Sequence, residues 1–361
     1  MIPSSRKIRV LVVDDSAIVR KLLADAIRQE PDMEVVGVAG DPFAARDLIL
    51  QREPDVVTLD IEMPRMDGLT FLKRLMAHRP LPVIIVSSVT QSGSAASIEA
   101  LRSGAIDVIA KPGGPQAVGQ VADRIKRRIR ALRGVSGLQF PSSVDAAPGP
   151  RAAAPAAAPA AWGRRVNGLL ALGASTGGTQ AIEALLTRLP ADIPPMVVVQ
   201  HMPPNFTKAF ADRLDNVCPM RVVESTGNET LERGTVYIAP GDHHLVVERL
   251  GLQLRTRLLQ GPPVHHQRPA VDVLFHSVAR LQGLAVVGIL LTGMGADGAD
   301  GMVALRAAGA ETIAEDEQSC VVFGMPKEAI VRGGATHVAT LLRMPTLIGE
   351  CLARLASPRV A

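Results

Sequence analysis

The stretch Leu169-Leu170-Ala171-Leu172-Gly173-Ala174-Ser175-Thr176-Gly177-Gly178 decides how the second half of the chain is expected to fold. Its apolar residues predict a buried strand, its glycines predict a sharp turn, and the pattern over residues 179–189 predicts a helix. A serine at such a turn lies at the carboxyl end of a sheet, next to the free N–H groups of a helix N-terminus. Two interpretations of Ser175 are open at this point. It is either the nucleophile of a G-x-S-x-G turn or a residue that only caps the helix.

Length and composition predict a globular protein of two or three domains. The chain has 361 residues, of which 47% are hydrophobic and 20% are charged, as is typical of a chain with a sizeable core. The net charge of +4 is small and aromatic residues make up only 2%, so neither charge nor base stacking favours a nucleic acid partner. No apolar run reaches the ~18–20 residues of a membrane-spanning helix, and we expect no membrane insertion.

The cysteines and the N-terminal segment predict a cytoplasmic protein. Cys218, Cys320 and Cys351 are odd in number and far apart, with neither the spacing of a metal site nor that of a disulfide framework. Such usage fits a reducing compartment. Residues 6–15, basic and then apolar up to two aspartates, do not have the pattern of a signal peptide.

The first third of the chain alternates between strand and helix patterns. Buried strands are predicted at residues 8–13, 35–39, 56–59, 83–86 and 108–110. Helices are predicted at residues 16–28, 43–51, 70–78 and 94–102, and from Gln116 onward. Five strand–helix units in about 125 residues predict a doubly wound α/β domain with a five-stranded parallel sheet. Ligands of such domains bind at the carboxyl ends of the strands.

Polar side chains follow four of these five strands. They are Asp14 and Asp15 after the first strand, Asp60 after the third, Ser87 after the fourth and Lys111 after the fifth. Three carboxylates at one edge repel each other unless a cation lies among them, and oxygen ligands with room for water suit Mg²⁺. A hydroxyl and an ammonium at the same edge suit a phosphoryl group. Each residue alone could be an ordinary helix cap, but together they indicate a metal and phosphate site.

Four motifs in this region resemble the receiver domain of response regulators. They are Val12-Val13-Asp14-Asp15-Ser16, Leu59-Asp60-Ile61-Glu62-Met63-Pro64-Arg65-Met66-Asp67-Gly68, Val86-Ser87-Ser88 and Ala110-Lys111-Pro112. The resemblance covers about residues 8–125. It implies a flavodoxin-like fold and a phosphoryl group that passes from a histidine kinase to Asp60.

The same resemblance implies the roles of the neighbouring residues. Ser87 would be the switch hydroxyl and Lys111 the ammonium that pairs with the phosphate. Mg²⁺ would be held by Asp14, Asp15, Asp60 and the backbone carbonyl of Glu62. One position departs from the pattern, because Val108 stands where many receivers carry an aromatic switch residue.

The composition changes after this domain. Residues 124–133 are strongly basic and continue a helical pattern, which predicts either a solvated face or a contact with another domain or an acidic partner. Residues 140–161 are rich in alanine and proline and contain few large apolar side chains to bury, as is typical of a flexible, partly extended linker. The predicted division is a receiver over residues 6–125, a basic helix end and linker over 126–163, and a second domain over 164–355.

The second domain shows another α/β pattern. Buried strands are predicted at residues 169–172, 196–199, 221–223, 285–291 and 312–314. Helices are predicted at residues 179–189, 206–214, 271–281 and 302–308. Residues 235–254 are expected to form strands joined by tight turns. The prediction is a doubly wound, mostly parallel α/β domain with an antiparallel insertion.

Ser175, His201 and Asp297 each follow a predicted parallel strand. A hydroxyl is a poor nucleophile until a base takes its proton, and an imidazole base needs a carboxylate to fix its tautomer. If the three strand ends lie at one edge of the sheet, these residues can form such a set. The order along the chain differs from that of α/β-hydrolases, so that fold is not implied.

A dinucleotide site is an alternative for the same region. Gly293, Gly295 and Gly298 match G-x-G-x-x-G between a strand and a helix, and Glu315 ends the next strand, where a ribose-binding acid would lie. An aspartate inside that turn, Asp297, would however repel a pyrophosphate. The alternative function is therefore a two-domain response regulator whose second half binds a dinucleotide or a protein partner without hydrolysis.

Five motifs resemble the catalytic domain of the chemotaxis protein-glutamate methylesterase (CheB) family, over about residues 167–352. They are Gly173-Ala174-Ser175-Thr176-Gly177-Gly178, Gln200-His201-Met202-Pro203, Tyr237-Ile238-Ala239-Pro240-Gly241, Arg268-Pro269-Ala270-Val271-Asp272-Val273-Leu274-Phe275 and Leu291-Thr292-Gly293-Met294-Gly295-Ala296-Asp297-Gly298. The resemblance implies the catalytic set Ser175, His201 and Asp297, and an oxyanion hole formed by backbone amides around Thr176 and Met294.

The resemblance to this family also implies the reaction. The substrates would be glutamate γ-methyl esters on the cytoplasmic helices of chemoreceptors, with glutamine side chains as a second substrate for deamidation. The esterase chemistry needs no cofactor, and Mg²⁺ belongs to the receiver. We further expect that the unphosphorylated receiver covers the Ser175 edge and that phosphorylation of Asp60 loosens this contact.

Overall fold

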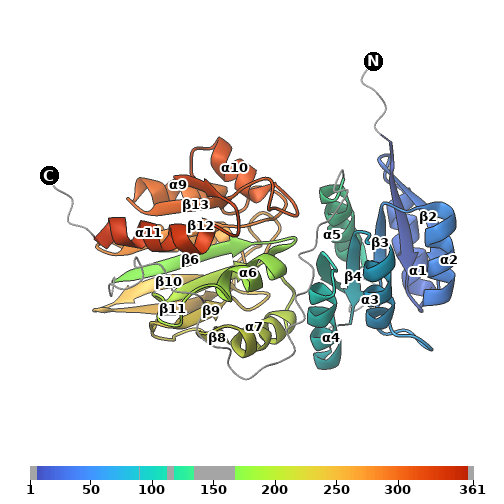
Figure 1. The fold of residues 1–361 in the computed structure, drawn as a ribbon, viewed down its shortest axis with the longest axis horizontal. Helices are drawn as coiled ribbons and strands as arrows, with labels where there is room; N and C mark the ends of the chain where they lie inside the picture. The colour runs from blue at the N-terminus through green and yellow to red at the C-terminus, as the bar shows by residue number, and fades with distance from the viewer. Residues whose placement is uncertain (1–5, 89, 112–117, 134–166, 357–361) are drawn as a thin grey trace, which may run out of the picture. The chain divides into compact units, whose positions relative to one another are not determined.

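The computed structural model describes residues 6–88, 90–111, 118–133 and 167–356. The chain divides into two compact units, residues 1–146 and 147–361 (Figure 1). The predicted linker over residues 134–163, the helix start at Gln116 and the proline that follows Lys111 lie outside the described residues. None of the helices in the described ranges is long and apolar enough to span a membrane.

The first unit contains a five-stranded parallel sheet in the order β2-β1-β3-β4-β5. Its strands are β1 (Ile8–Val13), β2 (Met33–Ala39), β3 (Val56–Leu59), β4 (Val83–Ser87) and β5 (Asp107–Ala110). Its helices are α1 (Ala17–Arg28), α2 (Pro42–Arg52), α3 (Gly68–His78), α4 (Gln91–Arg102) and α5 (Val118–Ala131). This arrangement confirms the predicted doubly wound fold.

Local sequence explains where the helices of this unit begin. Ser16 precedes α1 and its hydroxyl accepts the Val19 N–H at 3.4 Å. Asp67 precedes α3 and its carboxylate accepts the Thr70 N–H at 2.8 Å. Short polar side chains at such positions satisfy N–H groups that have no partner within the helix. The strands between the helices form the core, and all four residues of β3 are buried.

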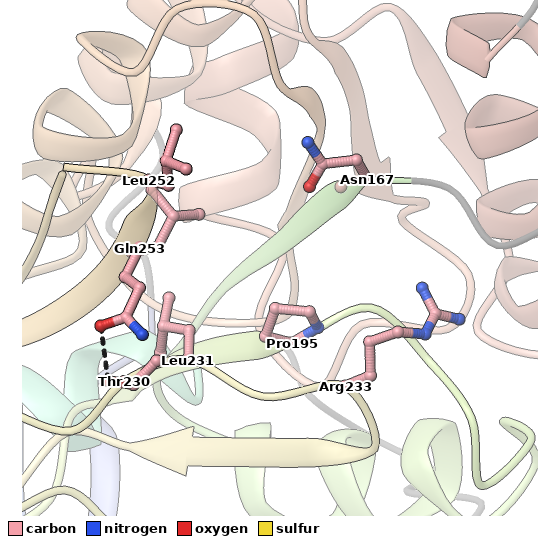
Figure 2. A pocket seen from close by; sticks show the side chains of 9 residues that line it. Asn167, Pro195, Thr230, Leu231, Arg233, Leu252 and Gln253 are labelled. Carbon is pink, nitrogen blue, oxygen red and sulfur yellow. Dashed lines mark hydrogen bonds between the residues drawn. The ribbon is translucent and has the colours of Figure 1, made fainter. Parts of the chain in front are cut away.

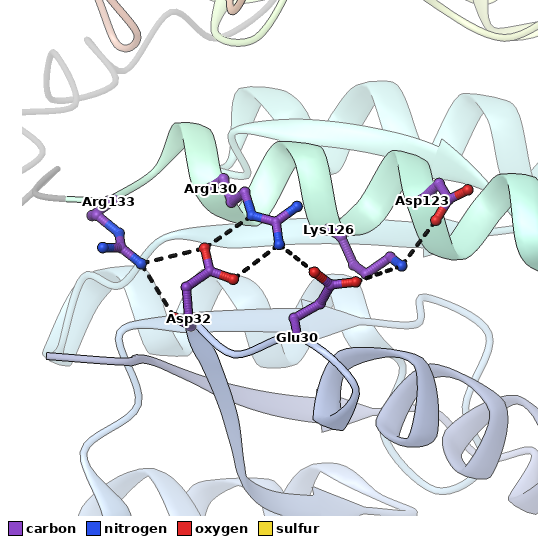
Figure 3. Close-up of polar contacts among 6 residues, drawn as sticks. All are labelled: Glu30, Asp32, Asp123, Lys126, Arg130 and Arg133. Carbon is purple, nitrogen blue, oxygen red and sulfur yellow. Dashed lines mark hydrogen bonds and ion pairs between the residues drawn. The ribbon is translucent and has the colours of Figure 1, made fainter. Parts of the chain in front are cut away.

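The basic end of α5 pairs with acids of its own unit (Figure 3). Lys126 lies 2.8 Å from Glu30, and Arg130 contacts both Glu30 and Asp32. Both acids lie in the segment between α1 and β2. The helix end is therefore not a purely solvated face, because much of its charge is neutralised within the unit.

The second unit contains a seven-stranded sheet in the order β14-β13-β12-β6-β7-β9-β8, in which every pair of neighbours is parallel. The strands are β6 (Gly168–Ala174), β7 (Met196–Gln200), β8 (Arg221–Glu224), β9 (Thr235–Ile238), β12 (Ala285–Leu290), β13 (Glu311–Glu315) and β14 (His337–Ala339). The helices are α6 (Gly178–Leu186), α7 (Phe206–Val217), α8 (Val271–Ala279), α9 (Ala299–Ala307), α10 (Met325–Val331) and α11 (Met344–Ala356).

The antiparallel part is a separate hairpin of β10 (His244–Leu250) and β11 (Gln253–Leu259). The predicted mostly parallel fold with an antiparallel insertion is confirmed. One detail differs, because Thr235–Ile238 belongs to the parallel sheet, where it pairs with β7 and β8. A buried run of four residues fits the interior of a parallel sheet as well as it fits a hairpin strand.

The core of the second unit is built on β6, whose seven residues are all buried. Helices α8, α9 and α10 pack on one face of the sheet through an apolar cluster that includes Leu274, Phe275 and Met302. Helices α6 and α11 also contact the sheet, at β6, β12 and β13 (Figure 1). Because β6 lies between β12 and β7, the carboxyl ends of these three strands meet at one edge.

Candidate functional site

The turn after β6 has room only for glycine at two positions. Gly177 has a φ of +78°, and a Cβ there would lie 2.6 Å from the side chain of Val321. A Cβ on Gly178 would lie 2.2 Å from the Gln200 amide oxygen. The chain can therefore reverse sharply between strand and helix, which leaves Ser175 at the edge of the sheet.

The structure brings the three predicted residues into contact. The Ser175 Oγ lies 3.0 Å from the His201 Nδ1, and the His201 Nε2 lies 2.7 Å from the Asp297 Oδ2. The three residues follow β6, β7 and β12, which are neighbours in the sheet, and each is 5% exposed or less. An ionised carboxylate only accepts hydrogen bonds, so the Nε2–H donates to Asp297. The lone pair of Nδ1 then accepts the serine proton.

Backbone groups at the start of α8 hold the aspartate. The Val271 N–H donates to Asp297 Oδ2 at 2.8 Å, and the Asp272 N–H donates to Oδ1 at 2.9 Å. Burial raises the pKa of Asp297, but the hydrogen bond and charge of His201 and these two N–H groups outweigh it, so the pKa lies below 3.8. The carboxylate is therefore ionised at neutral pH and fixed in direction.

A second turn packs directly on the serine. The Ser175 N–H donates to the Thr292 carbonyl at 3.0 Å, and the Thr292 hydroxyl donates to the Thr176 carbonyl at 3.0 Å. A Cβ on Gly293 would lie 2.7 Å from the Ser175 Cβ and 2.3 Å from the Met325 sulfur. The predicted Gly-Met-Gly turn and the turn that carries Ser175 are thus in contact.

The dinucleotide alternative is wrong for this turn. Asp297 lies inside the glycine-rich segment, but it is bonded to His201 and to the start of α8. Glu315 is fully buried and accepts the Thr292 N–H at 2.8 Å, so it does not face a ribose. Gly293 and Gly298 of this segment therefore serve close packing at the site, whereas Gly295 has open space beside it and a φ of +92°.

The sequence did not show which further groups hold the site together. The Gln200 Nε2 donates to the Ser175 carbonyl at 2.8 Å, and Gln200 is 2% exposed. The sequence could have indicated this role, because Gln200 lies directly before His201 at the end of a strand. The N–H groups that hold Asp297 left no signal, because every residue other than proline carries one.

The predicted phosphorylation edge of the first unit is also assembled. The Lys111 Nζ lies 2.8 Å from the Asp60 carboxylate and 3.0 Å from that of Asp14. Asp14, Asp15 and Asp60 each offer a carboxylate oxygen within 4.8 Å of the others. Asp14 and Asp60 are buried, whereas Asp15 is exposed. The Glu62 N–H donates to Asp60 at 3.2 Å.

The electrostatics of this edge fit a divalent cation. Burial raises the pKa of Asp60 to about 6, with the charge of Asp14 acting in the same direction and Lys111 acting against both. Burial likewise raises the pKa of Asp14, and Lys111 opposes it. A bound cation would relieve this crowding of carboxylates. The buried Ser87 hydroxyl has no hydrogen-bond partner among the described residues, as expected of a group that awaits a ligand oxygen.

One cavity of the second unit lies away from this chemistry (Figure 2). It has a volume of about 420 Å³ and lies at the amino ends of β6 and β7, against the turn between β10 and β11. Asn167, Pro195 and Leu231 are among its lining residues. The serine and its partners lie at the carboxyl ends of the strands and line no part of it.

Together, the two units define a response regulator whose second unit has the serine, histidine and aspartate geometry of a hydrolase. A family model described as "Response regulator receiver domain" matches residues 10–123, and one described as "CheB methylesterase" matches residues 170–348. The chain belongs to the CheB methylesterase family.

Relatives and a solved structure agree with this assignment. A protein-glutamate methylesterase/protein-glutamine glutaminase 2 of Syntrophus aciditrophicus is 50% identical over 335 residues, which are 93% of this chain and 96% of that protein. A protein of Chromohalobacter salexigens, named protein-glutamate methylesterase/protein-glutamine glutaminase, is 48% identical over 96% of each chain. The crystal structure of the Thermotoga maritima CheB methylesterase catalytic domain is similar with a TM-score of 0.50 and 38% identity, over 51% of this chain and 98% of that one.

Proposed function

We propose that this protein is a phosphorylation-controlled serine hydrolase that demethylates glutamate γ-methyl esters on chemoreceptors during chemotactic adaptation. Glutamine side chains of the same receptors are its second substrate, for deamidation. The relatives named above carry both activities in their names. The observation that supports the proposal best is the hydrogen-bonded series from Ser175 through His201 to Asp297, with distances of 3.0 and 2.7 Å.

The chemistry follows from these three groups. The Ser175 oxygen attacks the ester carbonyl while the His201 Nδ1 takes the serine proton. Asp297 stabilises the imidazolium that forms. The imidazolium gives the proton to the leaving group, which departs as methanol from an ester or as ammonia from an amide. Water then attacks the acyl-enzyme with His201 as base, which regenerates the serine and leaves a glutamate carboxylate.

The oxyanion of this reaction needs N–H donors. The Ser175 N–H is bonded to the Thr292 carbonyl at 3.0 Å, so it is not the donor. We assign this role to the backbone N–H groups of Thr176 and Met294. Their support is that Thr176 adjoins the nucleophile and that the turn containing Met294 packs against it through Gly293.

The receiver carries the control. Asp60 accepts a phosphoryl group from the chemotaxis histidine kinase, Lys111 pairs with the phosphate, and the Ser87 hydroxyl contacts it. When bound, Mg²⁺ neutralises negative charge on the phosphoryl group. Asp14, Asp15, Asp60 and the Glu62 carbonyl would hold the ion. Val108, which lies in β5, has no aromatic ring, so an aromatic rotamer is not part of this switch.

The receiver controls access to Ser175. Without phosphorylation a protein substrate is kept from Ser175, and phosphorylation of Asp60 admits it. The proposed boundaries are a receiver over residues 6–125, a helix end and linker over 126–163, and a catalytic domain over 164–355. The cytoplasm is the proposed location, since Cys218, Cys320 and Cys351 are all unpaired thiols.

The catalytic assignment is tested by methanol release from methylated receptor. Ser175→Ala should abolish release while the melting temperature stays unchanged. A Ser175→Ala protein that releases methanol at the wild-type rate would rule out the proposed nucleophile.

The receiver assignment is tested with a small-molecule phosphodonor. Asp60→Asn should take up no phosphate, whereas Asp47→Asn, an exposed aspartate of α2, should take it up normally. Control of access is tested by comparing full-length protein with a 163–361 fragment. Equal esterase rates in the absence of phosphodonor would contradict it.

A further inference from the structure

Glu315 is a buried acid that the proposed chemistry does not use. It ends β13, the strand beside β12, and its exposed fraction is 0%. Its Oε2 accepts the backbone N–H of Thr292 at 2.8 Å. Thr292 lies two residues after the end of β12, at the start of the turn that leads to Asp297. A fully buried carboxyl costs free energy unless its contacts offset that cost, so its position next to the site needs a reason.

Thr292 links this acid to the nucleophile turn. Its carbonyl accepts the Ser175 N–H at 3.0 Å, and its hydroxyl donates to the Thr176 carbonyl at 3.0 Å. The Val322 N–H donates to the same hydroxyl at 2.9 Å. The Thr292 carbonyl therefore holds the peptide group before Ser175, and the Thr292 hydroxyl holds the peptide group after Thr176, so the peptide group that carries the Thr176 N–H lies between two held ones. A small rotation of Thr292 would move Ser175 and the peptide after it together.

We propose that Glu315 is a positioning residue of the hydrolase site, which fixes Thr292 and through it the direction of Ser175 and of the proposed oxyanion donor at Thr176. This inference rests on the proposed function of the same site. Glu315 itself touches neither the nucleophile nor the histidine in any hydrogen bond of the described residues.

The surroundings of Glu315 show what this role requires. Its Oε1 is buried and has no hydrogen-bond partner of normal geometry in the described ranges. The polar groups near the carboxyl include Ser319, Cys320 and Asp316. Burial raises the pKa of Glu315 to about 7, so both protonation states occur near neutral pH. Oε2 accepts the Thr292 N–H in either state. The role therefore needs an acceptor of this length at this place, but no charge.

Four full-length variants separate the acceptor from the charge and from the side-chain volume. Glu315→Gln keeps an acceptor, Glu315→Leu keeps most of the volume without an acceptor, and Glu315→Ala removes both. Glu317→Gln changes an exposed neighbour and serves as the control. The measurement is kcat and KM for hydrolysis of 4-nitrophenyl acetate, a small ester whose access does not depend on receptor recognition.

We expect Glu315→Gln and Glu317→Gln to retain wild-type kcat within about twofold. Glu315→Leu and Glu315→Ala should lose about ten- to a hundredfold in kcat with KM nearly unchanged, because a reacting group is then misplaced. Wild-type kcat in Glu315→Leu or Glu315→Ala would overturn the proposal, as would a loss in Glu315→Gln as large as in Glu315→Ala.

A measurement on the wild type covers the case in which the apolar variants do not fold. The Thr292 amide should exchange slowly with deuterated solvent because Glu315 holds it. Exchange at the rate of a free amide would overturn the proposal. Failure of the proposed function would look different, because wild type and Ser175→Ala would then hydrolyse the ester equally slowly.

Discussion

Replacing Glu315 by glutamine should stabilise the protein at alkaline pH and change its stability little at acidic pH. Burial raises the pKa of the folded carboxyl from its ordinary value of 4.5 to about 7. Because the folded pKa is the higher one, the protonated carboxyl favours the folded state. This contribution is fully present below pH 4.5 and is lost as the pH rises through about 7. A glutamine carries no charge at either pH and avoids the loss.

The size of the effect follows from the two pKa values. One pKa unit corresponds to about 1.4 kcal/mol of free energy. The interval from 4.5 to about 7 therefore corresponds to about 3 kcal/mol once the pH is well above 7. Between about pH 5 and about pH 8.5, the free energy of unfolding of Glu315→Gln relative to wild type should rise by about 2–3 kcal/mol.

Urea denaturation followed by circular dichroism measures this difference. Both proteins are unfolded at about pH 5 and about pH 8.5, and the transition that responds to the substitution identifies the second unit. Glu317→Gln, which changes an exposed carboxyl two residues away, is the control substitution. A difference between Glu315→Gln and wild type that is the same at both pH values would refute the reasoning, since it would mean that Glu315 does not titrate in this range.

Three further predictions concern packing, a buried ion pair and the metal. Gly293→Ala should abolish esterase activity, because the new Cβ would lie 2.7 Å from that of the nucleophile, whereas Gly261→Ala, whose Cβ would have no neighbour closer than 3.9 Å, should leave activity unchanged. Arg128→Met should lower the free energy of unfolding of the receiver by about 3–5 kcal/mol, because the buried Asp107 then lacks the guanidinium that lies 2.8 Å away. In urea denaturation, the double variant with Asp107→Leu should recover much of the lost stability. Mg²⁺ at about five times its Kd should stabilise the receiver by about 1 kcal/mol in calorimetry, and an equal shift in Asp14→Asn would contradict the proposed ligands.

The sequence allowed the order of strands and helices to be predicted well, for a physical reason. The inner strands of both parallel sheets are buried on two faces, so they stand out as short apolar runs, and β6 is buried along its whole length. The turns after them need particular residues, such as Gly177 with its positive φ. Because parallel strands end at a common edge, the residues after β6, β7 and β12 could be expected to meet.

Edge elements and contact partners were not predictable in the same way. β14 has only three residues, and Val338 within it is 52% exposed, so it offers no apolar run. α11 follows it and was not predicted either. In the dinucleotide alternative Glu315 is a candidate ribose-binding acid, because the sequence shows its place at a strand end but not whether its side chain faces inward. That choice depends on packing between β12 and β13, which only the tertiary structure shows.

The orientation of the histidine ring has a consequence for recognising such sites by atomic templates. In serine proteases the Nε2 faces the serine and the Nδ1 faces the aspartate, whereas here the Nδ1 lies 3.0 Å from Ser175 and the Nε2 lies 2.7 Å from Asp297. A template built from protease atom names would not superpose on this site, although the residue types are the same. Searches for hydrolases of this kind therefore need a second template in which the two ring nitrogens exchange roles.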